Sequence, residues 1–478
     1  FVSEMIKKCD LNEFLLGNEN DSLMEIMYKM NASAKGIVFI LDDRGCFQGV
    51  ITDGDIKRAL LMHYTLNEKA AMIFKKQAVT AMRNESETLI EKKMNDKITI
   101  IPVLDENGKV IAYYQKEGAM PIADPQLNGN ELNYLLDAFV STWISSSGYY
   151  LNRFEKDFSE FCGCKYGVAT SNGTTALHLA LVALGIHEGD EVIVPDLTFA
   201  ATINAVIYTG ATPVIVDIEE DSWCIDPVKI EEAVTPRTKA IIPVHLYGQP
   251  CDMDAICSIA RKYNLYIVED CAEAHGAMYK DKKVGSFGDI GCFSFFGNKV
   301  ITTGEGGMCV TDSPELSERM RKYRDHGMSK ERRYYHEVIG FNYRMTNLQA
   351  AIGVGQLERI DSTLKWREEL EEKYQAILRN VKQVELQRKD LPDRKKIPWL
   401  VSVLVEADKR DEFINVMKQQ GIDSRAFFIP LSKMDLYKSY AKECKVSEAI
   451  ARRGINLPTN YRVTEDTIKK IAEIAGAL

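Results

Sequence analysis

Short apolar segments that alternate with helical ones constrain the fold of this chain more than any other feature. From about Leu132 onward, stretches of helical periodicity such as residues 253–264 separate them. The apolar segments are EVIVP, TPVIVDI, KAIIPVHLYG, LYIVED, GCFSFF and GMCVTD. Continuous apolar strands connected by helices are typical of a parallel sheet covered on both faces. The sequence therefore predicts an α/β fold with a mostly parallel central sheet.

The pattern changes along the 478 residues, a length that allows several domains. Residues 1–118 repeat an order of helix, strand, turn and strand, with the turns DRG and ENG about 60 residues apart, which suggests a tandem α+β module. The segment MPIADPQLNGN predicts a linker and the entry to the next domain over 119–131. We expect a large domain over 132–365 and a smaller α+β lobe over 366–478.

Composition excludes several classes of protein. The formal net charge is -9 and the pI is near 5.5, so we expect neither nucleic acid nor membrane as a partner. The eleven cysteines are odd in number, and several lie in apolar runs, as expected of reduced thiols in a cytoplasmic protein. Cys162 and Cys164 lack a second pair at metal spacing, so we expect no metal site. The opening residues are too charged for a signal peptide.

Lys299 is the first candidate for catalysis. It lies between the apolar run GCFSFF and the glycine-rich turn TTGEGG. Desolvation in such surroundings lowers the pKa of an amine, as Schiff-base chemistry requires. The alternative is a lysine whose ammonium extends to the surface. Lys299 alone does not decide between them.

Three further segments supply what a ring-shaped, phosphorylated cofactor needs. Asp270 ends LYIVED, at a strand end where α/β proteins bind ligands, and there it could keep a pyridinium nitrogen protonated; a helix cap is the alternative. The segment SNGTTALHLAL predicts a helix whose first N–H groups, with the Thr174 hydroxyl, form a phosphate cradle. Phe199 could stack on a ring.

From about Pro121 to the end, these motifs resemble those of the DegT/StrS family of sugar aminotransferases. The matching segments include WISSSG, SNGTTALHLAL, DEVIVPDLTFAATINAV, VEDCAEAHGA, GSFGDIGCFSFFGNKVITTGEGGM and GFNYRMTNLQAAIGVG. The resemblance implies an aspartate-aminotransferase-like fold, that of the fold type I enzymes, with pyridoxal 5'-phosphate as cofactor. The form FSFFGNK with ITTGEGGM is especially similar to perosamine synthases, which aminate C4 of a nucleotide-linked 4-keto-6-deoxyhexose for glycan or O-antigen biosynthesis.

The resemblance also implies residue roles. Lys299 would hold the cofactor as a Schiff base and then move the proton, while Asp270 would pair with the ring nitrogen. Glu273, where many relatives have Gln, would lie near the ring hydroxyl, and Phe199 would stack on the ring. The phosphate would be bound by Gly173, Thr174, Ser294 and, from the neighbouring subunit of a homodimer or higher homo-oligomer, Asn342.

The implied substrates are L-glutamate, as amino donor, and a nucleotide-linked keto sugar. A basic cluster spans residues 319–344 and could bind a diphosphate or a carboxylate, although solvated side chains explain most of it. Within it we expect Arg344, which adjoins Asn342, to bind substrate. His326 and His275 are further candidates, with a structural role as the alternative for each.

The N-terminal repeat resembles a pair of CBS domains, which often bind adenine nucleotides. Thr52 and Asp55 match the residues that contact ribose or phosphate in that family. Aligning the turns puts Ala112 opposite Thr52 and Gln115 opposite Asp55, so we expect one site at most. A packing module without ligand is the alternative.

Two other functions are compatible with the motifs. Amination at C3 and oxidative deamination of a sugar nucleotide would use the same cofactor residues. A catalytically inactive, nucleotide-sensing regulatory protein is an alternative of another class. Intact Lys299, Asp270 and Ser294 argue against it, because an inactive site has no need of all three.

Overall fold

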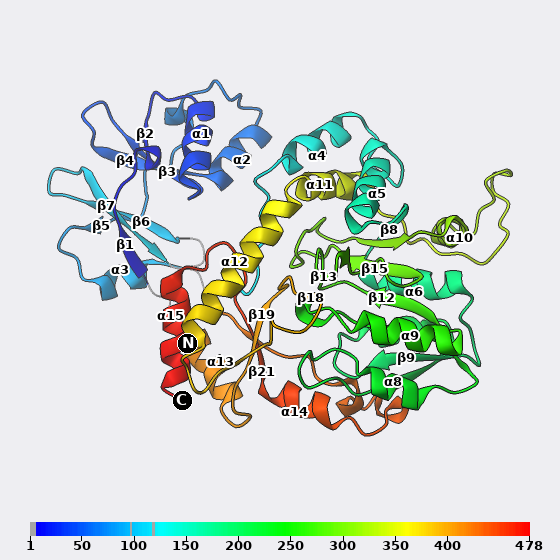
Figure 1. Ribbon diagram of the computed structural model, residues 1–478. Helices are drawn as coiled ribbons and strands as arrows, with labels where there is room; N and C mark the ends of the chain where they lie inside the picture. The colour runs from blue at the N-terminus through cyan, green and yellow to red at the C-terminus, as the bar shows by residue number, and fades with distance from the viewer. Residues whose placement is uncertain (1–5, 96–97, 117–119) are drawn as a thin grey trace. The chain divides into compact units, whose positions relative to one another are not determined.

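The computed structural model describes residues 6–95, 98–116 and 120–478, which form two compact units (Figure 1). The N-terminal unit is formed by the chain up to residue 119 together with 419–421. The C-terminal unit is formed by residues 120–418 and 422–478. No helix in these described residues is long and apolar enough to cross a membrane, and all eleven cysteines are free thiols.

The N-terminal unit is built from two equivalent hairpins. In the first, β3 (Ile37–Leu41) pairs with β4 (Phe47–Thr52), and in the second, β6 (Ile100–Leu104) pairs with β7 (Val110–Lys116). Each hairpin has its register shift at the corresponding place, before Leu41 and before Leu104. The tandem repeat expected from the sequence is therefore present.

The strand register corrects the alignment of the two halves. Ile37 pairs with Thr52 and, 63 residues later, Ile100 pairs with Gln115, so the residue equivalent to Thr52 is Gln115 and not Ala112. The turn glycines Gly45 and Gly108, whose φ angles are 78° and 76°, have the same spacing. The residue equivalent to Asp55 would be number 118, which lies outside the described residues.

The two halves share a core. Three strands in the order β2-β3-β4 form one sheet, and four in the order β1-β7-β6-β5 form the other. Apolar side chains from both sheets meet in one buried cluster, where the rings of Phe39 and Tyr113 lie 6.3 Å apart. The remaining elements are β1 (Ile6–Cys9), β2 (Leu16–Asn18), β5 (Ala81–Met82), α1 (Leu23–Ser33), α2 (Asp53–Leu61) and α3 (Glu87–Lys93).

A seven-stranded sheet forms the centre of the C-terminal unit. Its order is β10-β9-β11-β12-β15-β16-β8, and only β16 runs antiparallel to its neighbours. The mostly parallel sheet expected from the apolar segments is thus confirmed. The strands are β10 (Thr212–Val216), β9 (Glu191–Pro195), β11 (Thr238–Ile241), β12 (Tyr266–Asp270), β15 (Ile290–Ser294), β16 (Gly307–Thr311) and β8 (Tyr166–Thr170).

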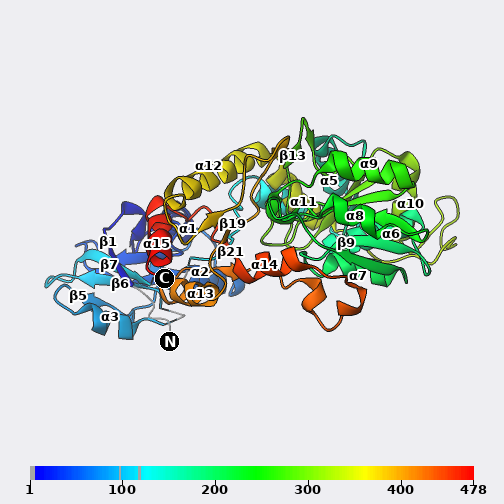
Figure 2. The ribbon, with the colours of Figure 1, turned by 60° about the horizontal axis from the view of Figure 1, so that its bottom comes forward.

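Helices cover both faces of this sheet (Figure 2). Alternate residues of β9 contact helices on opposite faces. Ile193 packs against α8 (Pro227–Ala233) and α9 (Met253–Tyr263). Val192 and Val194 pack against α6 (Gly173–Leu184) and α7 (Ala201–Tyr208). Strand residues buried on both sides explain the continuous apolar segments. At the β8 end the cover includes α5 (Tyr149–Cys162) and α11 (Asn347–Leu357), which packs against α4 (Glu131–Val140).

The C-terminal lobe has its own sheet and core. Strands β17 (Glu385–Leu386), β19 (Val401–Leu404), β21 (Gly454–Leu457) and β20 (Arg425–Ala426) pair in this order. The long helix α12 (Ile360–Leu378) leads into the lobe, and α13 (Arg410–Gln419) and α15 (Glu465–Gly476) complete its apolar core.

The first residues of the C-terminal unit are hydrogen-bonded into this lobe. The Met120 carbonyl accepts from the Asp423 N–H at 2.9 Å, and the Ile122 carbonyl accepts from the Thr459 N–H at 2.7 Å. Ile122 is also buried, 3% exposed. The start of the segment expected to be a linker is therefore part of the packed structure.

Candidate active site

The candidate site lies at the carboxyl ends of three strands of the central sheet. β12 ends at Asp270, β15 ends at Ser294, and the turn after β8 leads into α6 at Gly173. These three strands are parallel to one another, so their carboxyl ends lie at one edge of the sheet, where α/β proteins bind ligands. Sequence motifs that are distant along the chain thus come together.

Asp270 is a buried carboxylate, 6% exposed. Its Oδ2 accepts a hydrogen bond from the Thr202 hydroxyl at 2.8 Å, and its Oδ1 accepts from the Ala272 N–H at 3.1 Å. Burial raises the pKa of Asp270, which these hydrogen bonds and the charge of Lys299 only partly oppose. A cation placed against this carboxylate would favour its ionised form.

Lys299 lies in the turn that follows β15, and its side chain is 12% exposed. Its Nζ lies 3.8 Å from Glu273 Oε1 and 3.7 Å from the ring centre of Trp399. Burial lowers the pKa of the Lys299 amine, while Glu273 and Asp270 raise it. The desolvated amine expected from the sequence is present, and it has two carboxylates nearby.

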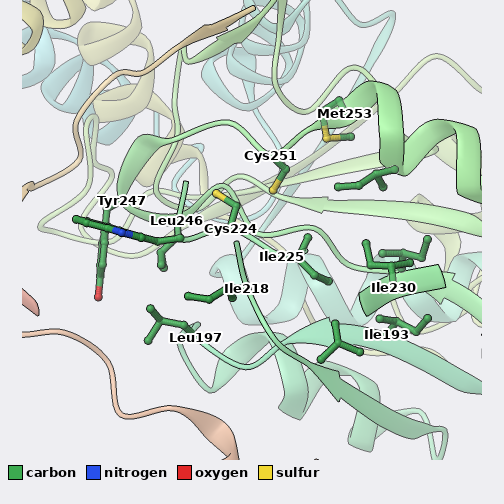
Figure 3. Close-up of a cluster of buried hydrophobic side chains, with 14 of the residues drawn as sticks. Ile193, Leu197, Ile218, Cys224, Ile225, Ile230, Leu246, Tyr247, Cys251 and Met253 are labelled. Carbon is green, nitrogen blue, oxygen red and sulfur yellow. The ribbon is translucent and has the colours of Figure 1, made fainter. Parts of the chain in front are cut away.

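Glu273 is the second buried carboxylate, 4% exposed. Its Oε2 accepts from the Tyr247 N–H at 2.9 Å, and burial raises the pKa of Glu273 to about 7. Tyr247 lies at one end of a buried apolar cluster, next to Leu246 (Figure 3). Its hydroxyl accepts from the Phe428 N–H at 3.2 Å. The apolar core therefore fixes the backbone group that orients Glu273.

Gly173 and Ser294 lie in close contact in the site. A Cβ on Gly173 would lie 2.8 Å from the Ser294 Cβ, so only glycine fits without a shift. Asn172 caps α6, where its side chain accepts from the Thr175 N–H at 2.9 Å. The first N–H groups of a helix have no acceptor inside the helix and attract anions. The expected phosphate cradle of Gly173, Thr174 and Ser294 is therefore sterically and electrostatically reasonable.

Phe199 and Asn342 are exposed. The Phe199 ring is 59% exposed and lies 5.7 Å from the Phe428 ring, measured between centres. Asn342 Oδ1 accepts from Arg344 Nε at 3.0 Å. Arg344 also pairs with Asp325 at 2.9 Å. Both exposed residues are available to a ligand or to a second subunit.

His326 belongs to the same group, because its Nε2 lies 3.4 Å from Arg344 Nη2. The bridge between Asp325 and Asn342 closes the base of a loop that extends from the body of the unit between α10 (Pro314–Arg324) and α11 (Figure 1). The structure thus brings Asn342, Arg344 and His326 together at the base of this loop. Their roles toward a ligand stay predictions.

His275 is placed differently. It is fully buried among the rings of Phe158, Phe293 and Phe295, with centre distances from 5.4 to 6.3 Å. Burial lowers the pKa of His275 to about 3, so the ring is neutral. These surroundings favour the structural alternative.

Two arginines of the basic cluster have structural partners. Arg321 and Arg324 pair with the buried Glu155 at 2.7 and 2.6 Å, and Arg324 also donates to the Ala169 carbonyl at 2.8 Å. These contacts fix α10 against β8 and α5. The expectation that most of this cluster does not bind ligand is consistent with them.

Three residues at the site were not predicted from the sequence. Thr202 donates to Asp270, Tyr247 orients Glu273, and Trp399 lies against Lys299. Thr202 lies in the same motif as Phe199, three residues further along the chain. Trp399 comes from the C-terminal lobe, and nothing local in IPWLVS indicates an active-site residue.

The residues fit pyridoxal phosphate. The protonated ring nitrogen of this cofactor would supply a cation that favours the ionised form of the buried Asp270. The first N–H groups of α6, which begins at Gly173, attract an anion such as the cofactor's phosphate. Lys299 has the desolvated amine that a Schiff base needs. The sheet and this set of groups define a fold type I pyridoxal-phosphate enzyme.

Two protein-family models match the chain. It belongs to the DegT/DnrJ/EryC1/StrS aminotransferase family, whose model matches residues 125–475. A CBS domain model matches residues 18–62. The expected family, fold, cofactor and aminotransferase activity are thereby confirmed, as is a CBS domain at the N-terminus.

Individual relatives agree with this assignment. GDP-perosamine synthase of Caulobacter vibrioides is 49% identical over 355 residues, which cover 73% of this chain and 95% of that protein. GDP-perosamine synthase of Escherichia coli O157:H7 is 45% identical, with 74% and 97% covered. Among solved structures, DesV of S. venezuelae has a TM-score of 0.71 and 34% identity, and covers 76% of this chain and 98% of that one.

Proposed function

We propose that the protein transfers the amino group of L-glutamate to C4 of a GDP-linked 4-keto-6-deoxyhexose. The observation that carries this proposal is the identity of 49%, 45% and 40% with three proteins named GDP-perosamine synthase, each covered almost completely. The intact group of Lys299, Asp270 and Ser294 supports activity and argues against a regulatory protein without catalysis.

The side chains would share the chemistry as follows. Pyridoxal phosphate, when bound, withdraws electrons from the carbon that loses its proton. Asp270 would stay ionised and keep the ring nitrogen protonated. Nζ of Lys299 would take the proton from the donor carbon and deliver it to the cofactor carbon, and the order reverses for the keto sugar. Burial, which lowers the pKa of the Lys299 amine, favours the unprotonated form that begins this transfer.

The other site residues would bind and orient. Gly173, Thr174 and Ser294 would hold the phosphate, and Phe199 would stack on the ring. Glu273 would lie near the ring hydroxyl. Arg344 and His326 would contact the substrate from the base of their loop.

A homodimer would complete each site with Asn342 of the neighbouring subunit. The exposed positions of Asn342 and Phe199 support this proposal. A further support is the apolar outer face of α4 and the segment after it, which a second subunit would cover. The exposed side chains there are Leu132, Leu136, Phe139, Val140 and Trp143, each more than half exposed.

The test is an assay of the purified protein with glutamate and a panel of 4-keto and 3-keto sugars linked to GDP, UDP or dTDP, followed by mass spectrometry. We expect one amino product, from the GDP-linked 4-keto sugar, and no product from Lys299→Ala. Turnover of a 3-keto substrate alone would support amination at C3 instead. Consumption of the amino sugar without 2-oxoglutarate would indicate oxidative deamination.

For the N-terminal unit we propose a single adenine-nucleotide site at Thr52 and Asp55. Asp55 Oδ2 accepts from the Thr52 hydroxyl at 2.6 Å, while Oδ1 pairs with Arg58 at 2.5 Å and Lys75 at 2.9 Å. These two cations are about half exposed and could reach a phosphate. Gln115 stands at the position of Thr52 in the second half, which supports a single site.

Calorimetric titration of the full chain with AMP and ATP tests this proposal. We expect one site per chain, weakened in Asp55→Ala, with the cofactor spectrum unchanged. Because Asp55 also caps α2, Lys75→Ala serves as a second variant that leaves the cap in place. Absence of heat with both nucleotides would favour the packing module.

A further inference from the structure

Trp399 connects the C-terminal lobe to the reactive lysine by two separate contacts. The face of its ring lies 3.7 Å from Lys299 Nζ. Its indole N–H donates to the carbonyl of Asn298, the residue before the lysine, at 2.7 Å. One side chain therefore contacts both the backbone that carries Lys299 and the amine at its end.

Further hydrogen bonds fix the backbone at Trp399. Nη1 of the buried Arg367, on α12, donates to the carbonyls of Pro398 and Trp399 at 3.0 and 2.9 Å. The Trp399 N–H donates to the Tyr247 carbonyl at 3.3 Å. Trp399 is 6% exposed. These contacts fix its ring, because both the backbone and the indole nitrogen have partners.

Catalysis would require the Lys299 amine to leave the cofactor when a substrate takes its place. Besides the Trp399 ring, the amine has Glu273 as a neighbour, with Oε1 at 3.8 Å from Nζ. The face of an aromatic ring attracts a cation, most strongly where water is excluded. Both neighbours thus favour the ammonium ion that forms when Lys299 takes up a proton.

We propose that Trp399 is a positioning residue that holds the released Lys299 amine during proton transfer. The indole N–H fixes the start of the lysine side chain, and the ring face receives its end. With the cofactor bound, Nζ of Lys299 would take one proton from the substrate and release it again within the same half-reaction, so no proton would be gained or lost. The proposal rests on the glutamate half of the function proposed above and makes no assumption about the sugar.

Two substitutions separate the two contacts. Trp399→Leu removes the ring face and the N–H together, whereas Trp399→Phe keeps a ring face and removes only the N–H. Trp366→Phe is the matched control, since this tryptophan of α12 stacks on Tyr461 at 3.7 Å. Glu273, Asp270 and His275, the titratable groups that interact with the amine, are unchanged in all three variants.

The first measurement needs no substrate. After removal of the cofactor, each full-length protein is mixed with pyridoxal phosphate, and the rate of Schiff-base absorbance is recorded against pH. Only the unprotonated amine reacts, so the midpoint reports the pKa of Lys299. Loss of the ring destabilises the ammonium ion, so we expect the midpoint of Trp399→Leu at lower pH. The midpoint of Trp399→Phe should stay near that of the unsubstituted protein.

The second measurement is the single-turnover reaction of the loaded protein with glutamate. A misplaced Lys299 amine slows proton transfer, so we expect the rate to fall by about tenfold or more in Trp399→Leu. The isotope effect from α-deuterated glutamate should increase, because proton transfer then limits the rate more strongly. The glutamate concentration for half-saturation should change little. Trp399→Phe should be slowed less. If the sugar assay fails while these results hold, only the proposed sugar substrate is wrong.

A structural role alone would give another pattern. It would lower the melting temperatures of Trp399→Leu, Trp399→Phe and Trp366→Phe alike and leave the pH midpoint and isotope effect unchanged. That result overturns the proposal. If Trp399→Leu does not fold, Trp399→Phe decides, because an unchanged rate and isotope effect in this variant would exclude positioning through the Asn298 carbonyl.

Discussion

Asp270 has its carboxylate at the buried end of a strand, with a hydroxyl and an N–H as its hydrogen-bond donors. A neutral amide in its place would keep the shape of the site and remove the charge. We expect Asp270→Asn to bind the cofactor and to lose about two to three orders of magnitude in the rate of the glutamate half-reaction, because the ring nitrogen would lose its proton. Stopped-flow absorbance measures this rate.

The matched control is Asp289→Asn. Asp289 lies just before β15, at the other end of the same pair of strands as Asp270. It is partly buried and accepts from the Ile267 N–H at 2.8 Å. Its substitution should affect stability and not the half-reaction. Equal losses in both variants would contradict the role of Asp270.

Glu273 makes stability depend on pH. Its folded pKa of about 7 lies above the ordinary value of 4.5, so the folded protein retains a proton that the unfolded chain has released. The stabilisation is complete below pH 4.5 and is lost as pH rises to about 7, by up to about 3 kcal/mol. In the cofactor-free protein, Glu273→Gln should remove this decline. Urea unfolding at several pH values tests it, and parallel curves for both proteins would disprove it.

The sequence motifs predicted some residues of the site and missed others. Lys299 and Asp270 could be predicted because apolar neighbours and a strand end place them locally. Trp399 could not, since its contact with Lys299 depends on how the C-terminal lobe packs against the large domain. His275 shares a motif with Asp270, yet the aromatic rings around it come from α5 and β15 and could not be deduced from that motif.

At the scale of elements, the turn between β8 and α6 depends on close packing. A methyl group on Gly173 would meet Ser294 at the floor of the proposed phosphate cradle. We expect Gly173→Ala to weaken binding of pyridoxal phosphate by about tenfold, because either the backbone at residue 173 or that at Ser294 must move to make room for the methyl group. Titration of the cofactor-free protein, followed by absorbance, measures the dissociation constant.

Gly476→Ala is the control for that experiment. Gly476 ends α15, and a Cβ there has no atom within 4 Å. Its cofactor affinity should equal that of the unsubstituted protein. An unchanged affinity in Gly173→Ala would show that the cradle tolerates the methyl group and that the phosphate binds elsewhere.

Strands were predictable where the sequence contains short, continuous apolar segments bounded by helical ones. The apolar segments became β9, β10, β11, β12, β15 and β16, since burial on both faces leaves a clear signal. The antiparallel direction of β16 could not be read from its sequence, because an apolar strand looks the same in either direction. In the N-terminal unit the repeat was visible, but its exact offset required the hydrogen-bond register.

At the scale of the whole molecule, the proposed homodimer allows a complementation test. Lys299→Ala and Asn342→Ala subunits should each be inactive as homodimers. A hybrid of the two has one site that contains both substitutions and one that contains neither, so mixing under conditions that exchange subunits should restore up to half of the activity per hybrid. Recovery is followed with the glutamate half-reaction.

The control is a mixture of two Lys299→Ala preparations with different tags, which reports the extent of exchange without restoring activity. Demonstrated exchange without recovery would contradict a site shared between subunits. The sequence of a single chain could suggest this arrangement only through family resemblance, because a contact between subunits leaves no periodic pattern.

The hydrogen bonds of Met120 and Ile122 have a mechanical consequence. The polypeptide leaving the N-terminal unit enters the C-terminal unit at Met120, which is bonded to Asp423 of the small lobe. If the two ends of the molecule were pulled apart in a force spectrometer, tension from the N-terminal unit would be borne first by these bonds. The chain that leads on to the seven-stranded sheet would carry this tension only after these hydrogen bonds had broken.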